Sequence, residues 1–359
     1  MKQLLILILF TFSFVCKGQT AAVYNEEEVI ELNQLLYKKK DSTLITGKVF
    51  MYAITGKKII TEVNYKEGKK EGVTTSWYAQ GQFKEVVHFK DDIQDGLIKR
   101  WYENGQLQAE ANFIKGSQEG LLKEWYENGQ LQREANFKGG EPEGISKVWF
   151  ENGQLAKEVN FIAGVKDGLS KEWYENGQQK IDQPYKKGKP EGLCKQWYDN
   201  GQLQQEANIL QGTREGVFKE WHENGQQKAE QLFKMDKPEG ISRFWYDNGQ
   251  LNKEQQFKKG QAEGENREWH ENGQLKQAVN LIGGILEGLY RDWYDNGQIY
   301  QEAIFKNGEP DGIAKVWYEN GQLMREGHYT NGKKDGIHFH YTEKGVIEKK
   351  EIWENGVLK

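Results

Sequence analysis

The sequence contains few cysteines and few prolines. Its 359 residues include two cysteines, Cys16 and Cys194, and five prolines. Cys16 lies in an N-terminal segment that we expect to be removed, so the mature chain would keep one cysteine and form no internal disulfide. The stability of the fold must then come from strand pairing and side-chain packing.

An excess of positive charge is also missing. The chain has 49 Lys and Arg against 54 Asp and Glu, which gives a formal net charge of −5. Proteins that bind nucleic acids or anionic membranes depend on clustered Lys and Arg. The balanced charge therefore argues against nucleic-acid partners and against membrane binding, and it favours a charged surface exposed to water.

Glycine and aromatic residues are abundant instead. There are 41 Gly, 12 Trp, 17 Tyr and 16 Phe, and the mean hydropathy of the chain is −0.87. Such a composition favours many short strands joined by turns over a thick helical core.

One hydrophobic run stands out, and it lies at the N-terminus. Residues 1–19 have a basic start at Lys2, an apolar run from Leu4 to Phe14 and a polar exit. This is the layout of a secretory signal peptide, and the apolar run is too short to span a bilayer as a helix. We expect cleavage near Gln19 and an exported product that is periplasmic, cell-surface or extracellular.

Cys16 leaves a second possibility, in which the mature chain begins with a lipidated cysteine. Bacterial lipoprotein signals usually place small residues just before that cysteine, whereas Phe14 and Val15 precede it here. The sequence therefore favours a soluble exported product over lipoprotein anchoring through Cys16.

A repeat of 24 residues fills most of the chain and is the main structural signal. Tryptophan recurs every 24 residues from Trp77 to Trp317. Tyr341 takes the next position of this series, and a further repeat opens at Gly47, one residue out of step. We count about thirteen repeats over residues 46–359, preceded by residues 20–45 as a lead-in that forms a short helix or a capping strand. The recurring tryptophans are Trp77, Trp101, Trp125, Trp149, Trp173, Trp197, Trp221, Trp245, Trp269, Trp293 and Trp317.

Each repeat holds two turn signals, so 24 residues fit two strands of about eight residues. The first turn is the Asn-Gly of the segment WYENGQ, and this dipeptide favours two-residue hairpin loops. The second turn lies in segments such as KGGEPEG at residues 138–144. The sequence predicts an all-β fold, an elongated antiparallel β-hairpin array that forms a solenoid-like meander.

A two-residue loop at Asn128 and Gly129 fixes which residues face each other. It places Lys123 opposite Glu134, whereas a register shifted by one residue would bring Lys123 to Arg133, like charges in direct contact. Stacking without shear would extend these pairs into a continuous Lys–Glu ladder across neighbouring hairpins. The same rule predicts the pairs Glu124–Arg133, Lys99–Glu110, Lys147–Glu158, Lys171–Asp182, Lys195–Glu206, Lys219–Glu230, Arg291–Glu302 and Lys315–Glu326.

This register also sorts the two faces of the sheet. It places Trp125 opposite Gln132 and Tyr126 opposite Leu131. Equivalent tryptophans would lie about 9.6 Å apart, two strand spacings, so we expect Gln132 and its equivalents to fill the gaps between indoles. One face would carry Tyr126, Leu122, Leu131, Ala135 and Phe137, with Gly120 leaving room for the phenyl ring, and the other Trp125, Leu121 and the Lys123–Glu134 pair.

The segment WYENGQLQREANFKGGEPEG at residues 125–144 resembles the MORN-variant repeat, in the bacterial group of YwqK-like antitoxin components. The shared pattern is an aromatic pair, Asn-Gly, a leucine, an acidic residue, an aromatic residue, and a second turn ending in Asp-Gly or Glu-Gly. The lead-in LLYKKKDSTLITGKV at residues 35–49 is also similar to that group. The resemblance implies a MORN-like hairpin array used for interaction rather than chemistry, and the group's label implies a toxin partner.

No segment has the pattern of a catalytic or cofactor site. The glycines lie in hairpin turns rather than between a strand and a helix, so none forms a phosphate-binding loop. Cys194 takes a strand position held elsewhere by Leu122 or Ser146, which favours a small filler over a nucleophile. The carboxylates recur in every repeat with cationic partners, whereas a catalytic site is a singular departure from a scaffold. We expect no enzyme activity, no catalytic residue and no cofactor.

Histidines are the remaining candidates for chemistry. His222 and His270 take the position of Tyr126 in their repeats, which indicates aromatic substitution. His338 and His340 lie two residues apart on one face of the last repeat, a spacing that suits metal chelation. No third ligand is near them in the sequence, so we expect no metal site.

The tryptophan row is the main candidate for a functional surface. One interpretation is packing against Gln and Leu, and the other is a partly exposed strip that binds a protein, because Trp and Tyr dominate interface energetics. The leading hypothesis is an exported non-enzymatic scaffold for protein–protein contact at the cell envelope or outside the cell. The alternative is an antitoxin-like or immunity protein that neutralises a cognate toxin by binding it. The candidate interaction strip comprises Trp125, Trp149, Trp173, Trp197, Trp221 and Trp245.

Overall fold

The structure is a computed structural model that describes residues 22–53 and 58–359. The expected signal peptide at residues 1–19, with Cys16, lies outside the described residues. The described part of the chain is nearly all β-strand, with one 3-10 helix, η1 (Glu26–Glu28). It contains no helix with the length and apolarity needed to cross a membrane. The chain divides into a first half, Met1–Glu141, and a second half, Pro142–Lys359.

Four hairpins of the repeat form the first half. The lead-in before them is extended rather than α-helical: β1 (Val23–Asn25) pairs in parallel with the first strand of the first hairpin, while β2 (Val29–Leu32) and β3 (Leu35–Lys38) form a small hairpin of their own. The parallel β1 occupies a strand edge that would otherwise expose unpaired N–H and C=O groups. The four hairpins are β4 (Gly47–Tyr52) with β5 (Ile59–Lys66), β6 (Lys69–Trp77) with β7 (Phe83–Lys90), β8 (Ile93–Trp101) with β9 (Leu107–Ile114), and β11 (Gly120–Trp125) with β12 (Leu131–Lys138).

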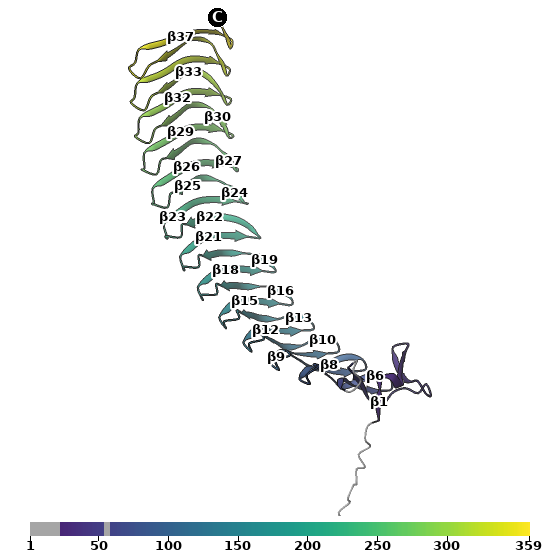
Figure 1. Cartoon of the computed structure of the whole chain (residues 1–359). Coiled ribbons are helices and arrows are strands. Elements are labelled where there is room, and N and C mark those ends of the chain that lie inside the picture. Colours follow the sequence, from purple (N-terminus) through teal and green to yellow (C-terminus); the bar gives the residue numbers. More distant parts are fainter. Residues whose placement is uncertain (1–21, 54–57) are drawn as a thin grey trace, which may run out of the picture. The chain divides into compact units, whose positions relative to one another are not determined.

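Nine further hairpins form the second half, and they follow one another in sequence order (Figure 1). The thirteen predicted repeats are therefore thirteen hairpins within the described residues. The nine are β14 (Gly144–Trp149) with β15 (Leu155–Ile162), β17 (Gly168–Trp173) with β18 (Gln179–Lys186), β20 (Gly192–Trp197) with β21 (Leu203–Leu210), β22 (Thr213–Trp221) with β23 (Gln227–Lys234), β25 (Gly240–Trp245) with β26 (Leu251–Lys258), β28 (Gly264–Trp269) with β29 (Leu275–Ile282), β31 (Gly288–Trp293) with β32 (Ile299–Lys306), β33 (Glu309–Trp317) with β34 (Leu323–Thr330), and β36 (Gly336–Tyr341) with β37 (Ile347–Glu354).

Two-residue strands mark most of the second turns, where they extend the pairing of the preceding strand. They are β10 (Ser117–Gln118), β13 (Glu141–Pro142), β16 (Val165–Lys166), β19 (Lys189–Pro190), β24 (Lys237–Pro238), β27 (Gln261–Ala262), β30 (Ile285–Leu286), β35 (Lys333–Lys334) and β38 (Val357–Leu358).

The predicted charge register is confirmed. Lys123 stands opposite Glu134, and Lys147 stands opposite Glu158 rather than opposite Lys157. Lys171–Asp182 and Lys315–Glu326 are opposite in register as well. The ion-paired N···O distances are 3.0 Å for Lys99–Glu110, 3.4 Å for Lys123–Glu134, 3.4 Å for Lys147–Glu158, 3.8 Å for Lys195–Glu206, 3.7 Å for Lys219–Glu230, 2.6 Å for Arg291–Glu302 and 3.6 Å for Glu124–Arg133.

The loop itself differs from the prediction. The N–H of Tyr126 donates to the carbonyl of Gln130 at 2.8 Å, and the N–H of Gly129 donates to the carbonyl of Tyr126 at 2.9 Å, so the loop has three residues. Gly129 has a φ of +85°, whereas Asn128 is not in the left-handed region. A two-residue type I′ loop needs positive φ at both positions, but a three-residue loop needs it only at the last.

One bulged residue then restores the register. Trp125 stands opposite Leu131 and Glu124 opposite Arg133, so Gln132 has no partner across the hairpin. The predicted pairing of Trp125 with Gln132 is wrong, as is the predicted pairing of the turn tyrosine with Leu131. The charged pairs stay right because a three-residue loop plus one bulged residue shifts the strands by the same amount as a two-residue loop.

Asparagine explains why this loop recurs. In the hairpin of β8 and β9, the Oδ1 of Asn104 accepts the N–H of Gln106 at 2.9 Å, and its Nδ2 donates to the carbonyl of Glu127 in the next hairpin at 2.9 Å. An aspartate could accept the first hydrogen bond but could not donate the second. The same side chain therefore closes its own loop and ties it to the next one.

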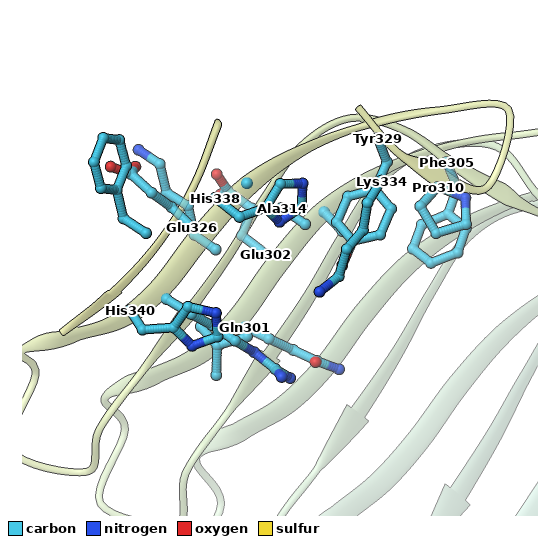
Figure 2. A pocket seen from close by; sticks show the side chains of 16 residues that line it. Gln301, Glu302, Phe305, Pro310, Ala314, Glu326, Tyr329, Lys334, His338 and His340 are labelled. Atoms are coloured by element: carbon cyan, nitrogen blue, oxygen red, sulfur yellow. The ribbon is translucent and has the colours of Figure 1, made fainter. Parts of the chain in front are cut away.

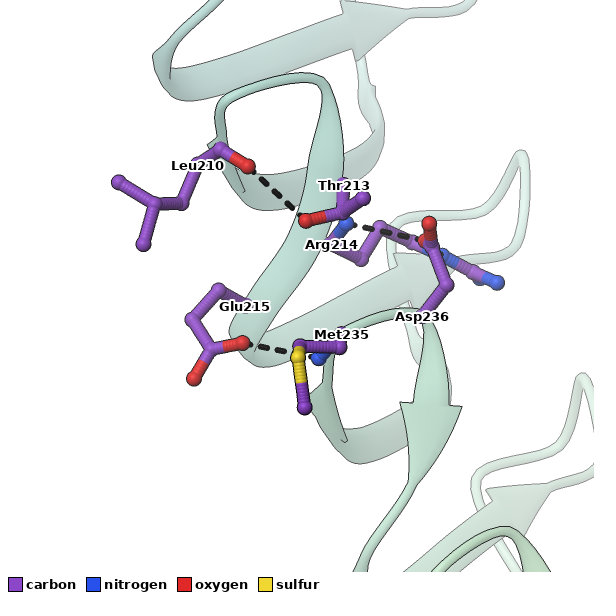
Figure 3. A network of polar contacts seen from close by, with 6 residues as sticks. All are labelled: Leu210, Thr213, Arg214, Glu215, Met235 and Asp236. Atoms are coloured by element: carbon purple, nitrogen blue, oxygen red, sulfur yellow. Dashed lines mark hydrogen bonds and ion pairs between the residues drawn. The ribbon is translucent and has the colours of Figure 1, made fainter.

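An acidic side chain holds most of the second turns. Figure 3 shows one example, in which Glu215 accepts the N–H of Met235 at 2.9 Å and Asp236 accepts the N–H of Arg214 at 2.9 Å. Met235 and Asp236 have positive φ values of 49° and 60°, so these hydrogen bonds fasten strained residues. Equivalent bonds join Glu119 to Gly139, Glu143 to Ala163, Asp167 to Lys187, Glu191 to Gln211, Glu239 to Lys259, Glu263 to Gly283 and Glu287 to Asn307.

The two faces of the sheet differ in burial. We call the face with Leu122, Ala135 and Phe137 the buried face, and the face with Lys123 and Glu134 the ladder face. In the first half the buried face forms an apolar cluster of Val87, Ile98, Ala111 and Leu122, against which Phe89, Phe113 and Phe137 pack. In the second half its buried positions include polar residues, namely Ser170, Ser242, Asn266 and His338. Strand pairing therefore carries more of the stability there.

Reversing one charge of the ladder tests the register. Lys195 stands opposite Glu206 in its own hairpin and opposite Asp182 of the previous one. Lys195→Glu would place three acids side by side, so we expect the free energy of unfolding to fall by about 1 kcal/mol. Urea denaturation measures the change. The neutral variant Lys195→Gln removes the two attractions without adding a repulsion, so it should lose less stability, and equal midpoints for Lys195→Glu and Lys195→Gln would contradict the pairing.

Candidate interaction surface

The ladder face carries alternating charges from strand to strand, from Lys99 to Glu134 in the first half and from Lys147 to Glu254 in the second. Glu110 stands opposite Lys123 of the next hairpin, and Glu158 stands opposite Lys171, as predicted for stacking without shear. The lysines of these pairs keep more than a third of their side-chain surface exposed. Each pair therefore contributes about 1 kcal/mol or less, and the ladder specifies register more than it adds stability.

The tryptophan row lies on the same face. The ring of Phe83, which takes the Leu131 position of its repeat, lies 6.2 Å from the ring of Trp77 and 5.5 Å from that of Trp101. The residue at this position, which is apolar in most repeats but Gln179 and Gln227 in two of them, therefore lies between neighbouring indoles, so the expected filling by Gln132 and its equivalents is wrong. The bulge at Gln132 causes the exchange, because it turns Leu131 onto the ladder face.

Each residue of the expected interaction strip ends a strand and is half-buried. Trp125 closes β11, and the other five close β14, β17, β20, β22 and β25 of the second half. The structure thus places the tryptophans on the expected face, but packed between neighbouring side chains rather than standing free. Both interpretations of the row remain compatible with this position.

A row of exposed aliphatic residues lies beside the ladder, and the sequence analysis did not single it out. Leu121 was placed on this face, but its exposure was not foreseen. The sequence pattern that could have revealed the row is an aliphatic residue directly after the second-turn Asp-Gly or Glu-Gly, repeated every 24 residues on the charged face. We call these residues the aliphatic row, with exposed fractions from 40 to 54%: Leu121, Ile145, Leu169, Leu193, Val217, Ile241, Leu289, Ile313 and Ile337.

At most first turns a tyrosine joins its hairpin to the next. The hydroxyl of Tyr102 donates to the carbonyl of Trp125 at 2.8 Å, and that of Tyr246 donates to the carbonyl of Trp269 at 2.8 Å. The predicted aromatic substitution by histidine has a physical reason. His222 Nε2 lies 3.0 Å from the carbonyl of Trp245, and His270 Nε2 lies 3.0 Å from that of Trp293, so each ring N–H replaces the hydroxyl as donor.

Cys194 is half-buried in β20, opposite Ala207 of β21. Burial raises the pKa of its thiol, and the nearby carboxylate of Asp182 adds to the effect. A raised pKa lowers the thiolate fraction, which is the nucleophilic form. This environment suits the small filler expected from the sequence.

His338 is a packing residue of the buried face. It is 5% exposed, and its Nε2 donates to the carbonyl of His328 at 2.9 Å. Its ring lies 5.3 Å from that of Tyr329 and occupies the space over Gly327, where an added Cβ would meet the imidazole at 2.0 Å. Burial lowers the pKa of His338, so the ring is neutral.

A hollow of about 250 Å³ adjoins this histidine on the buried face. Figure 2 shows Phe305, Pro310 and Tyr329 on one side of the hollow and His338 and His340 on the other. Residues 22–53 and 58–359 contain no group of three or more His, Cys, Asp or Glu side chains placed to hold a metal ion.

A family profile described as MORN repeat variant matches ten segments that together cover more than half of the chain: residues 94–115, 118–138, 142–163, 166–187, 190–210, 214–235, 238–259, 262–281, 286–307 and 310–331. The chain belongs to the MORN repeat variant family. Each matched segment of this MORN-variant chain spans about one hairpin. Segment 118–138, for example, contains β11, its Asn-Gly loop and β12.

Other comparisons add little to this assignment. No curated protein matches the MORN-variant chain significantly. Similar solved structures include the crystal structure of TcdB2–TccC3–Cdc42, the Photorhabdus luminescens Tc holotoxin pore, and TcdB2–TccC3 without its hypervariable C-terminal region. All three are 10% identical, match 88 to 89% of this chain and 20 to 22% of their own, and have TM-scores of 0.16, 0.16 and 0.18. The chain thus spans about a fifth of their length, and likeness at this level carries no argument.

Removing a turn hydroxyl tests the tie between hairpins. Tyr246→Phe deletes the donor to the carbonyl of Trp269, so we expect the free energy of unfolding to fall by about 1 kcal/mol. Phe150 is a natural counterpart without the hydroxyl, and Phe150→Tyr should gain a similar amount. Urea denaturation of both variants checks this, and a midpoint that moves in neither variant would show that the hydroxyl bond adds nothing.

Acid should loosen the last hairpin. The ammonium of Lys349, 2.5 Å from Glu351, and the indole N–H of Trp353 hold the pKa of Glu351 at about 2, against an ordinary value of 4.5. Because the folded-state pKa is depressed, this stabilisation is present above pH 4.5 and is lost as the pH falls toward 2. Carboxyl chemical shifts in NMR should report the depressed pKa, and Lys349→Ala should raise it. A pKa near 4.5 in the unsubstituted protein would contradict the contact.

Proposed function

We propose that this MORN-variant chain is an exported, non-enzymatic scaffold that binds a protein partner along its ladder face. The aliphatic row is the observation that carries the proposal. Exposed apolar residues are normally scattered singly over a protein surface, and aligned ones mark interaction sites. Ile145, Leu169, Leu193, Val217 and Ile241 follow one another in five consecutive hairpins, each 40 to 50% exposed.

The spacing of the row favours a partner that contacts several hairpins at once. Equivalent residues recur every two strands, about 9.6 Å apart. Each contact is small, but contacts repeated along one surface add up in affinity. The neighbouring Lys–Glu ladder supplies charged groups of both signs at the margin of the row, as in the polar rim of a protein interface.

The balanced charge supports a protein partner over a nucleic acid or an anionic membrane, since neither would find the clustered Lys and Arg that it needs. The recurrent carboxylates already have structural tasks. Glu119 and its equivalents accept backbone N–H groups at the second turns, and Glu134 and its equivalents pair with the lysines of the ladder. These tasks support a scaffold without catalytic carboxylates.

Export is supported by the N-terminal layout alone. A basic residue, an apolar run and a polar exit in residues 1–19 have the order of a secretory signal. The partner would then be found at the cell envelope or outside the cell.

The aliphatic row can be tested directly. The exported chain, carrying a photo-crosslinking group beside Leu193, would capture the partner from the envelope fraction, and affinity for the purified partner would then be measured. The triple variant Leu169→Ser, Leu193→Ser, Val217→Ser should weaken binding at least about tenfold, because each residue loses buried apolar area.

A matched control carries the same number of changes outside the row. Ile162, Leu210 and Ile285 are 50 to 55% exposed and lie at second turns. Their triple replacement by serine should leave affinity close to that of the unsubstituted chain. Deletion of residues 169–216, two complete repeats, should also weaken binding. Equal affinity of the row variant and the control would exclude the row as the binding surface.

A second candidate is an antitoxin-like or immunity protein that neutralises a toxin by binding it. The resemblance of residues 125–144 to the repeat of YwqK-like antitoxin components favours this candidate. Co-expression of the chain with the product of a toxin-like neighbouring gene tests it. Restored growth would support neutralisation, and unchanged killing by every such product would exclude it.

A further inference from the structure

Between β14 and β34 the charge ladder of the second half is interrupted at one place. Acids occupy its alternate positions at Glu158, Asp182, Glu206, Glu230, Glu254, Glu302 and Glu326, but the position between Glu254 and Glu302 holds Ala278. Ala278 of β29 stands opposite Arg267 of β28 on one side and opposite Arg291 of β31 on the other. From β14 to β34 it is the single acid position of the ladder without a carboxylate; in the last hairpin, β36 and β37, the two ladder positions hold Phe339 and Lys350.

Two arginines therefore flank a methyl group where the repeat otherwise places an acid. Each carries a planar guanidinium with five N–H donors, which suits carboxylate recognition better than the lysine of most repeats. Arg291 donates from Nε to Glu302 at 2.6 Å, so its terminal N–H groups remain available. Arg267 contacts Glu265, two residues away on the same strand, at 3.1 and 2.8 Å.

Glu265 does not fill the vacant position. It takes the place of an aliphatic-row residue, at the far side of Arg267 from the tryptophans, and its side chain is 56% exposed. An ion pair as exposed as this one is weak and can be shared with a second carboxylate. The two substitutions, Glu265 and Ala278, both belong to the hairpin of β28 and β29.

An open hollow of about 640 Å³ lies over this gap on the ladder face. Ala278 lies in it with Arg267 and Arg291, and Trp269, Trp293 and Leu275 line its apolar part. Glu265 and Glu287 also line the hollow, and the carboxylate of Glu287 accepts the N–H of Asn307 at 2.8 Å. The site thus pairs two guanidinium groups with aromatic and aliphatic walls.

We propose that this gap binds a carboxylate group carried by an apolar body. The carboxylate takes the position of the missing ladder acid between Arg267 and Arg291, and the apolar part contacts Trp269, Trp293 and Leu275. A free aromatic acid and an acidic side chain of a protein offer the same chemistry. The site does not depend on the proposed scaffold function, since a small carboxylate would bind whether or not a protein partner exists.

Fluorine NMR of the full chain with 4-fluorobenzoate measures this binding, with neutral 4-fluorobenzamide as the control ligand. We expect saturable binding of the benzoate at one site and at least about tenfold weaker binding of the amide, because charge-assisted hydrogen bonds are lost. Absence of saturable benzoate binding, or equal binding of the amide, would overturn the proposal.

Variants at Ala278 locate the site. Ala278→Glu restores the acid found in the hairpins on either side, so the chain is expected to fold and to lose benzoate binding. Ala278→Ser keeps the gap open and should retain it. Glu254→Ala creates a second gap between Arg243 and Arg267 and should add a second binding event. Binding that survives Ala278→Glu would refute the location.

A third probe, N-acetyl-glutamate N-methylamide, distinguishes the two possible sources of the carboxylate. Tighter binding of the capped glutamate than of 4-fluorobenzoate points to an acidic side chain of a protein, and the reverse order points to a free aromatic acid. If the aliphatic-row variant loses affinity for the partner but still binds benzoate, the aliphatic row and the gap at Ala278 are independent binding sites.

Discussion

Pairing of each hairpin with the next is the constraint on which this protein depends. Each half is a single open sheet with partly covered faces, so no repeat has a closed core of its own, and a lone two-stranded hairpin is marginally stable in water. Side chains reinforce the pairing between neighbouring hairpins at up to three places. A turn asparagine, a turn tyrosine or histidine, and a second-turn carboxylate each bond to backbone groups about one repeat away, as seen for Asn104, Tyr102 and Glu119. The recurring turn residues of this chain thus mostly join neighbouring hairpins.

The two faces of the sheet have different roles. On the buried face the residue types vary from Leu122 to Ser170 and Asn266, because each site need only fit its immediate neighbours. On the ladder face the pattern is nearly constant, with tryptophan, a Lys–Glu pair and an aliphatic residue in parallel rows. A constant pattern with exposed apolar groups offers a partner the same contacts at each hairpin. The interruption at Ala278 matters because it makes one position on this uniform surface chemically distinct.

Much of the fold was accessible to pattern reasoning because charge and turn residues recur at a fixed spacing. The pairing of Lys147 with Glu158 followed from avoiding like charges, and it holds in the structure. The pairing of Trp125 with Gln132 failed, since loop length and bulge compensate for one another and leave no trace in residue spacing. The aliphatic row was assigned to the right face in Leu121, but its exposure depends on how the neighbouring side chains cover it. Ala278 was overlooked because its significance appears only when both flanking strands are known.

The sequence by itself determined the repeat, the antiparallel hairpins and the sign of the charges that meet, since all three are encoded in local periodicity and turn chemistry. Only the tertiary structure decided which apolar row is open to solvent and which residues fill the gaps between tryptophans. It also decided that two arginines converge on one alanine. These features depend on the stacking of neighbouring hairpins and on a one-residue bulge, and both arise from contacts between strands rather than from the order of residues within one.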